Sequence, residues 1–126
     1  MKLTIPIDVV PQKRPRFYRG VAVDPAKSRK FKQDLAMLVK TLRRGTALLE
    51  GELSVELHIY RTGFRSVITQ QYGDIDNLVK GIFDALTGVV WKDDRQISRL
   101  LVTKNQGDTP RVELTIEEVK KCGNKQ

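Results

Sequence analysis

The strongest constraint on the fold of this chain is a strict alternation of apolar and polar residues over positions 52–60. This period of two is typical of a β-strand with one buried face and one face in water. The inward residues are Leu53, Val55, Leu57 and Ile59, and the outward ones are Glu52, Ser54, Glu56, His58 and Tyr60. We therefore expect a sheet with one polar, solvated face. His58 is then expected to be a plain surface residue.

Three more segments are predicted to be strands. Residues 2–9 alternate, with Leu3, Ile5, Ile7 and Val9 on one face. Residues 96–104 and 111–118 are the other two, and the NQGD segment between them predicts a hairpin. Before the first helix, the two prolines and four basic residues of Pro11 to Gly20 predict a basic loop.

Two segments have helical patterns. Asp24-Pro25 is a favourable start for the first helix, and Gly45 ends it. Its apolar stripe is Phe31, Leu35, Leu38 and Leu42, and its basic solvent face is Lys27, Arg29, Lys30, Lys32, Lys40, Arg43 and Arg44. The second helix covers about 75–87 and buries Leu78, Ile82 and Leu86.

The order β-α-β-α-β-β predicts an α+β (mixed α/β) fold, in which a sheet packs with two helices. With 126 residues, we expect one small domain over 1–120 and a polar C-terminal tail over 121–126. No apolar run approaches the roughly 18 residues of a membrane span, and the N-terminus has no signal core, so we expect a cytoplasmic protein. The single cysteine, Cys122, excludes an intrachain disulfide.

Charge is divided unevenly along the chain, whose net charge is +8. Residues 12–44 carry eleven Lys or Arg against two Asp, and residues 74–94 carry five Asp against two Lys. A basic surface attracts a polyanion such as nucleic acid, whereas a compact acidic cluster repels it unless a cation lies between them. An enzyme that cuts phosphodiesters needs both a basic surface for the nucleic acid and an acidic cluster for a cation. On charge alone, a basic nucleic-acid-binding domain with incidental acids is the simpler interpretation.

The acidic cluster has an ordered spacing. Asp74 and Asp76 stand where the second helix begins, Lys80 follows one turn later, and Asp93-Asp94 lie in the loop after the helix. Converging carboxylates repel one another unless a divalent cation neutralises them. With one histidine and one cysteine in the chain, such a cation would be held by carboxylates, as Mg²⁺ and Mn²⁺ are. Each residue also has a structural interpretation, because Asp74 and Asp76 suit a helix cap, Lys80 a surface ion pair and Asp93-Asp94 a polar turn.

These residues resemble the RusA family of Holliday junction resolvases, found in bacteria, phages and prophages. The resemblance extends over essentially the whole chain. It is strongest in D74-I-D76-N77-L78-x-K80-x-x-F83-D84-A85-L86 and W91-K92-D93-D94, with a P-x-K-R-P-R loop at Pro11 to Arg16.

The resemblance implies a homodimer that binds four-way DNA junctions and nicks them in symmetric pairs, with Mg²⁺ or Mn²⁺ as cofactor, in DNA recombination and repair. It implies catalytic roles for Asp74, Asp76, Lys80 and Asp94, and metal binding by Asp74, Asp76, Asp93 and Asp94. Asp84 also matches, but we leave it out because its FDAL context suits a structural role. We expect DNA contacts from Lys13, Arg14, Arg16, Arg19, Lys27, Arg29 and Lys30. The alternatives are a non-catalytic basic DNA-binding protein and a nuclease for flaps, forks or RNA.

Overall fold

The strand predicted from the alternating pattern, β4 (Leu53–Arg61), is an inner strand of the sheet. The computed structural model describes residues 1–10, 16–18, 21–23, 26–62 and 75–119. β4 pairs antiparallel with β6 (Arg111–Glu118) and parallel with β5 (Ile97–Gln106). The short β1 (Lys2–Ile5) pairs antiparallel with the outer edge of β6, which gives the order β1-β6-β4-β5.

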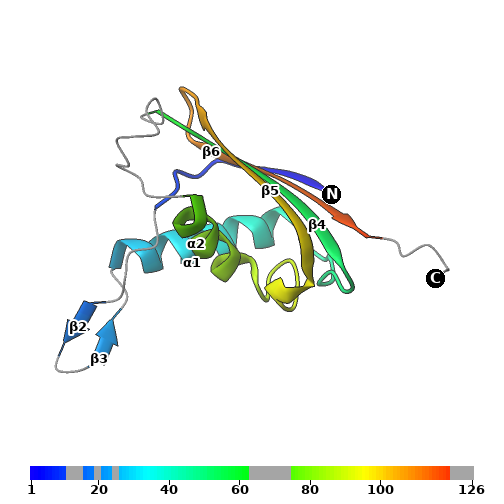
Figure 1. Ribbon diagram of the computed structural model, residues 1–126, viewed down its shortest axis with the longest axis horizontal. Helices are drawn as coiled ribbons and strands as arrows, with labels where there is room; N and C mark the ends of the chain where they lie inside the picture. Colours follow the sequence, from blue (N-terminus) through cyan, green and yellow to red (C-terminus); the bar gives the residue numbers. More distant parts are fainter. Residues whose placement is uncertain (11–15, 19–20, 24–25, 63–74, 120–126) are drawn as a thin grey trace.

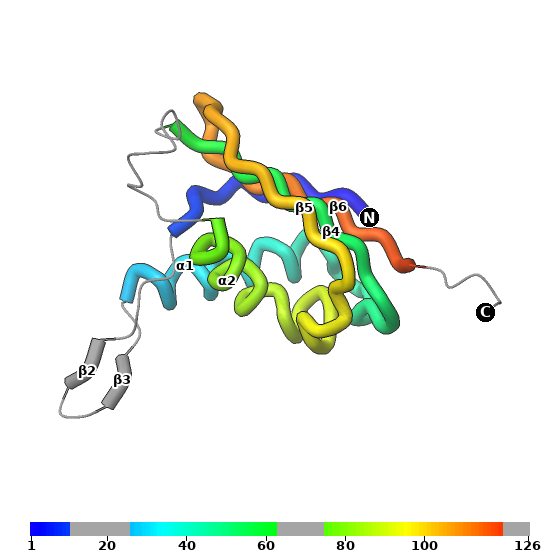
Figure 2. The backbone as a smooth tube through the Cα atoms, in the orientation of Figure 1, coloured from blue at the N-terminus to red at the C-terminus, as the bar shows by residue number. Residues whose placement is uncertain are grey.

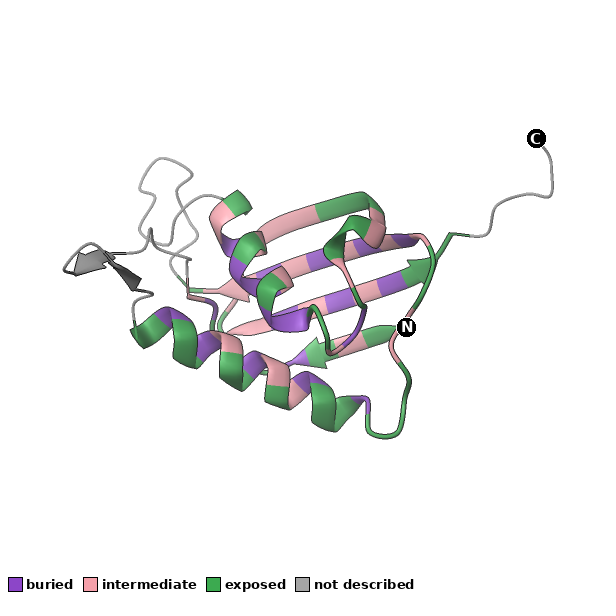
Figure 3. Ribbon diagram, turned by 90° about the horizontal axis from the view of Figure 1, so that it is seen from below, coloured by how far each residue is buried: buried purple, intermediate pink, exposed green. Residues whose placement is uncertain are grey.

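Both helices, α1 (Ala26–Leu42) and α2 (Ile75–Leu86), lie against the same face of this sheet (Figure 1). The buried side chains of β4 are the predicted ones, and the residues between them are only half-buried. Figure 3 shows this contrast as alternating bands along the strands. The predicted α+β class and element order are therefore confirmed. The core consists of Ile5, Val9, Phe31, Leu35, Val39, Leu53, Val55, Leu57, Ile59, Leu78, Ile82, Ala85, Leu86, Val90, Trp91, Val112, Leu114 and Ile116.

The predicted hairpin between the last two strands is wrong. β5 and β6 are consecutive in the chain, but β4 lies between them and pairs with both. Neighbouring strands are about 4.8 Å apart, so four connecting residues are long enough to pass the end of one intervening strand. Turn residues predict where a chain reverses, but they do not determine which strands then pair.

The structure also corrects the predicted basic loop and first helix. Part of the loop forms β2 (Arg16–Tyr18), which pairs with β3 (Val21–Val23) as a separate two-stranded sheet. In α1, Val39 takes the buried position instead of Leu42, which is 50% exposed. Arg43 was predicted on the solvent face, but it is 6% exposed and donates hydrogen bonds to backbone carbonyls. The start predicted at Asp24-Pro25 lies outside the described residues.

α2 connects the parallel pair β4 and β5, as parallel pairing requires a crossover. The chain leaves α2, turns through residues 87–93, forms the short helix η1 (Asp94–Gln96) and enters β5 at once. β5 is an outer strand of the sheet, and Figure 2 shows α2 on the helix-covered side beneath the strands. Among the described residues, no helix is long and apolar enough to cross a membrane.

Candidate active site

A cleft of about 270 Å³ lies between α2 and β5. Its polar residues come from α2 and from η1, and β5 contributes an apolar wall. The lining residues are Ile75, Asp76, Val79, Lys80, Phe83, Asp84, Asp94, Leu100 and Val102. Three of the predicted site residues, Asp76, Lys80 and Asp94, therefore line one cleft. Asp74 lies outside the described residues.

The helical repeat explains why α2 presents these groups together. Leu78, Ile82 and Leu86 are fully buried, which fixes the face that α2 turns to the core. Asp76, Lys80 and Asp84 are spaced by four residues, so they lie in one row along the exposed flank of the same helix. Lys80 thus stands one turn from a carboxylate on each side.

Asp94 reaches the cleft because the segment before it is anchored in the core. Trp91 is fully buried, and its Nε1 donates to Thr87 Oγ1 over 3.1 Å. Its ring meets Phe83 edge-on, with centroids 5.4 Å apart. The cleft residue Phe83 and the anchor Trp91 therefore form one packed unit, which ties the loop carrying Asp94 to α2.

Gln96 holds the backbone just before Asp94. Its Oε1 accepts from the Lys92 and Asp93 amides at 2.9 and 3.0 Å. Its Nε2 donates to the Leu49 and Gly51 carbonyls at 3.0 Å each. One amide side chain thus joins the segment before β4 to the loop after α2.

Arg43, the residue after α1, also holds this loop in place. Its guanidinium donates to Val89 O at 3.0 Å, to Val90 O at 3.5 Å and to Ala47 O at 2.9 Å. Val90 O also accepts from Leu49 N at 2.7 Å. Neither Arg43 nor Gln96 was predicted to support the site, because their roles depend on carbonyls that are distant in sequence.

Asp93 is engaged in the cap of η1 and does not line the cleft. Its carboxylate caps η1 by accepting from Arg95 N at 2.9 Å, and the Arg95 side chain donates to it at 3.0 and 2.8 Å. These hydrogen bonds lower the pKa of Asp93 from 3.8 to about 2. It lines a separate hollow with Gly51, Glu52, Arg95, Gln96 and Ser98.

Asp84 lines the cleft, although it was left out of the predicted site. Its Oδ2 lies 3.5 Å from Lys32 Nζ of α1, which connects the two helices by an ion pair. Asp84 is half-exposed, so the pair adds little stability. The helical spacing already predicts that Asp84 lies in one row with Asp76 and Lys80, and only its FDAL context favoured a structural role.

The predicted DNA-binding residues are described only in part. Lys27, Arg29 and Lys30 are exposed at the beginning of α1, where Lys30 Nζ is 2.9 Å from Asp34 Oδ2. Arg16 lies in β2, and its side chain is not described. Lys13, Arg14 and Arg19 lie outside the described residues.

The donors in the cleft suit a hard divalent cation. Asp76 and Asp94 supply carboxylate oxygens, and Mg²⁺ is usually held by one or two carboxylates together with water and substrate phosphate. Within the described part of the chain, no three His, Cys, Asp or Glu side chains form a closed metal site. The two cleft carboxylates fit an ion that takes its remaining ligands from water and from a substrate phosphate.

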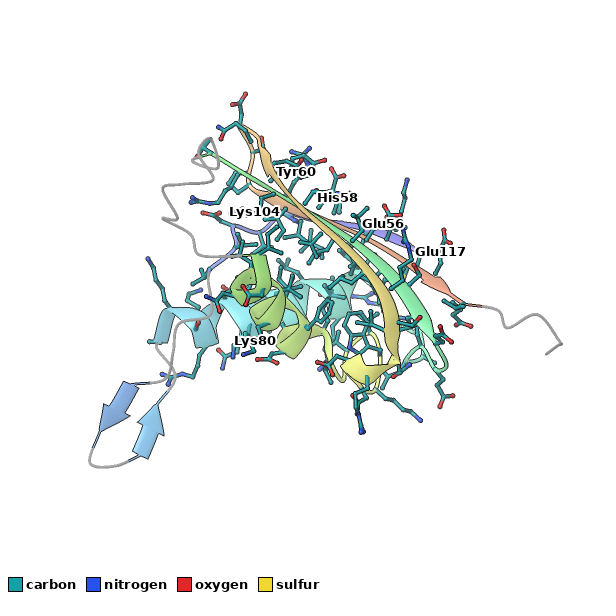
Figure 4. The ribbon with its side chains drawn as sticks, in the orientation of Figure 1. Glu56, His58, Tyr60, Lys80, Lys104 and Glu117 are labelled. Carbon is teal, nitrogen blue, oxygen red and sulfur yellow. The ribbon has the colours of Figure 1, made fainter. Side chains whose placement is uncertain are left out.

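The opposite, open face of the sheet carries His58, as predicted. Its Nδ1 lies 2.6 Å from Thr103 Oγ1, and its Nε2 lies 3.4 Å from Glu56 Oε1. Figure 4 shows Glu56, His58 and Tyr60 on the side of the sheet away from α2 and Lys80. His58 is thus separated from the cleft by the sheet itself.

Comparison with known proteins assigns this fold and cleft to a class. The family model described as endodeoxyribonuclease RusA matches residues 6–117, so the chain belongs to the RusA family of endodeoxyribonucleases. The match extends from the residue after β1 almost to the end of β6, and it includes the whole cleft. The chain is also 36% identical to a Bacillus subtilis (strain 168) protein titled "Uncharacterized protein YqaN", over 94% of this chain and 96% of that protein.

Proposed function

We propose that this protein resolves four-way DNA junctions by paired symmetric nicks, in a reaction that depends on a divalent cation. The observation that carries the proposal is the convergence of Asp76, Lys80 and Asp94 on one cleft, in a chain of the RusA family. DNA recombination and repair are the processes that need this reaction. A cytoplasmic location agrees with a DNA substrate.

The cation, Mg²⁺ or Mn²⁺, would be held by Asp76 and Asp94 together with Asp74, which precedes α2 by one residue. When bound, such an ion lowers the pKa of water and neutralises negative charge at the phosphorus that is attacked. For Asp93, which was predicted as a fourth ligand, we propose a different role, because its oxygens accept hydrogen bonds from Arg95 and from the η1 backbone. Its proposed role is to cap η1 and so hold Asp94 at the cleft.

Lys80 and the apolar wall act on the substrate directly. The Lys80 ammonium, between Asp76 and Asp84 on the helix flank, is placed to offset charge on the scissile phosphate. Leu100 and Val102 line the cleft from β5 and limit the water near the reacting bond. Electrostatic interactions are stronger where water is excluded, so this wall strengthens the interaction of the Lys80 ammonium with the scissile phosphate.

The basic residues of α1 and of the segment before it would bind phosphates on the junction arms. Those contacts carry little sequence information, and their strength falls steeply as salt rises. Two cuts related by two-fold symmetry need two active sites with the same symmetry, which an isologous dimer supplies. We therefore propose a homodimer, for which a sizing experiment at micromolar concentration is the direct test.

The decisive experiment is to incubate synthetic four-way junctions with the protein and Mg²⁺ or Mn²⁺. We expect symmetric nicks from the wild type and no nicks from D76N or D94N. Asp108→Asn, an exposed aspartate in the turn between β5 and β6, is the matched control with the same change of charge. Asp93→Asn tests the revised assignment, because asparagine also caps helices and should preserve cleavage.

Two outcomes would refute the proposal. A wild type that binds junctions but never nicks them would show a non-catalytic DNA-binding protein. Equal cleavage of junctions, linear duplex, flaps, forks or RNA would show a broader nuclease. Loss of cleavage in D93N at unchanged thermal stability would return Asp93 to the ligand set.

A further inference from the structure

β5 forms a long outer edge of the sheet. It is the last strand in the order β1-β6-β4-β5, and among the described strands it pairs with β4 alone. The opposite outer strand, β1, has four residues, whereas β5 has ten. The N–H and C=O groups on the outer side of such a strand are a template on which another strand pairs.

The middle of this edge is apolar on both faces of the sheet. Leu100 and Leu101 are each 41% exposed, and they point to opposite faces because neighbouring residues of a strand alternate. The register with β4 passes over Ser98 and is regular from Arg99 onward. Proteins protect an outer strand with proline, bulges or several charges, and residues 99–103 contain no proline, no bulge and one charge. A regular, apolar edge of this kind favours a strand as its partner.

We propose that β5 pairs antiparallel with β5 of a second copy of this chain, about a two-fold axis at Leu101. This inference rests on the proposed function, which requires a homodimer. The two-fold axis between antiparallel strands of one sheet is perpendicular to the sheet, so residues opposite each other share a face. Leu101 then lies opposite Leu101 of the partner subunit, and Leu100 lies opposite Val102 of the partner subunit.

The sequence of β5 is complementary to itself in this register. The central pairs are apolar on both faces, and the cation beside them, Arg99, lies opposite Thr103 of the partner subunit. Shifting the register by two residues would place Arg99 opposite the partner's Leu101, or Leu100 opposite the partner's Lys104. Apolar side chains directly opposite each other stabilise a strand pair, and like charges destabilise it. A second copy therefore satisfies this edge better in the central register than in either neighbouring one.

Edge pairing also puts both active sites on one side of the dimer. Both helices cover the same face of the sheet (Figure 1), and the axis is perpendicular to that face. The cleft lies between α2 and β5, so the two clefts flank the axis and their apolar walls meet at Leu100 and Val102. Packing the open faces of two sheets together would instead turn the clefts away from each other. Paired nicks in one junction need the first arrangement.

Sedimentation equilibrium at micromolar concentration, without DNA, measures the dimer directly. Leu101→Lys places two ammonium groups opposite each other at the axis, so the Kd of the dimer should rise about tenfold or more. Val119→Lys is the matched control, because Val119 is 38% exposed and follows β6, away from β5. Leu101→Val keeps an apolar side chain and should keep the wild-type Kd.

Cross-linking tests the register independently of the lysine variant. In a Cys122→Ser background, a short bismaleimide should join Leu101→Cys to its copy, since side chains directly opposite each other are about 5 Å apart. Glu117→Cys, on the open face of β6 (Figure 4), should not cross-link, because five strand spacings separate the two β6 strands by about 24 Å. With Mg²⁺, the wild type should linearise a supercoiled plasmid that extrudes a cruciform, whereas Leu101→Lys should leave mainly nicked circles.

Three results would overturn the proposal. They are an unchanged Kd in Leu101→Lys, an equal loss in Val119→Lys, or cross-linking through Glu117→Cys in place of Leu101→Cys, which would show that the open faces pack together. The Leu101→Cys cross-link decides the same question if Leu101→Lys does not fold. A wild type that dimerises through Leu101 but never nicks junctions would refute the proposed cleavage and leave this interface standing. A wild type that nicks junctions in pairs but dimerises elsewhere would refute only the interface.

Discussion

Replacing Arg43 by methionine tests how the fold holds Asp94 at the cleft. The substitution keeps an aliphatic stem in place but removes the donors to Ala47 O, Val89 O and Val90 O. Val90 O keeps a partner, because Leu49 N also donates to it. All three carbonyls therefore lose the guanidinium, and two of them, Ala47 O and Val89 O, keep no other donor among the described residues.

The size of the effect follows from these contacts. An unsatisfied buried carbonyl costs about 1–3 kcal/mol, and the two affected bonds are only partly buried, so the lower half of that range applies. Arg43 Nε is buried and finds no acceptor among the described residues, so its removal offsets about 1 kcal/mol. We expect a net loss of about 2 kcal/mol, which lowers Tm by about 8 °C in a domain of this size.

The measurement is urea unfolding followed by circular dichroism, with Arg44→Met as the control at an exposed neighbour. The m value should stay unchanged, because the folded state buries the same surface.

At a temperature where the variant is folded, kcat should fall by up to about 100-fold, since a displacement of Asp94 by 1 Å suffices for that. A change in stability below about 0.5 kcal/mol, the usual range for surface substitutions, would refute the hydrogen-bond argument. A lower stability with unchanged kcat would show that the position of Asp94 does not depend on the Arg43 hydrogen bonds.

Three further predictions concern the same loop and the cleft. Mn²⁺ at about ten times its Kd should stabilise the wild type by about 1.4 kcal/mol, and thermal unfolding should show no such shift for D94N. Gln96→Ala removes a side chain that makes four hydrogen bonds, so urea unfolding should show a loss of about 1–2 kcal/mol and nicking should slow. The pKa of Asp93 is depressed to about 2 in the folded protein, so its stabilising effect is complete above its ordinary value of 3.8 and disappears as pH falls toward 2. The Tm difference between wild type and D93N should therefore narrow over that interval, and a constant difference would contradict the role of the Arg95 pair.

The parts of the fold that were predictable are those governed by local periodicity. The alternation over 52–60 identified the buried face of β4, and the spacing of Leu78, Ile82 and Leu86 identified the buried face of α2. Once that face is known, the helical repeat places Asp76 and Lys80 together on the exposed flank. The side of the cleft that α2 forms could thus be predicted without knowing how the strands pair.

The parts that were not predictable depend on partners distant in sequence. The hairpin prediction failed because β4 offers hydrogen-bonding edges to both β5 and β6, and pairing with β4 buries more apolar surface than a two-stranded ribbon. Arg43 follows a basic run on α1, and its burial is favourable because the distant Val89 and Val90 carbonyls accept its hydrogen bonds. Local patterns carry no information on such carbonyls.

Asp93 and Asp94 show most clearly what three-dimensional structure adds to a motif. In the sequence they form one acidic pair, and both were predicted to bind metal. In the structure the chain bends between them, because Asp93 has the extended backbone of a helix cap and Asp94 is the first residue of η1. The two side chains consequently line different hollows, one beside Arg95 and one beside Lys80. An acidic pair of this kind supplies one carboxylate to the cleft and one to the turn, and the pair D93N and D94N separates these roles in a single assay.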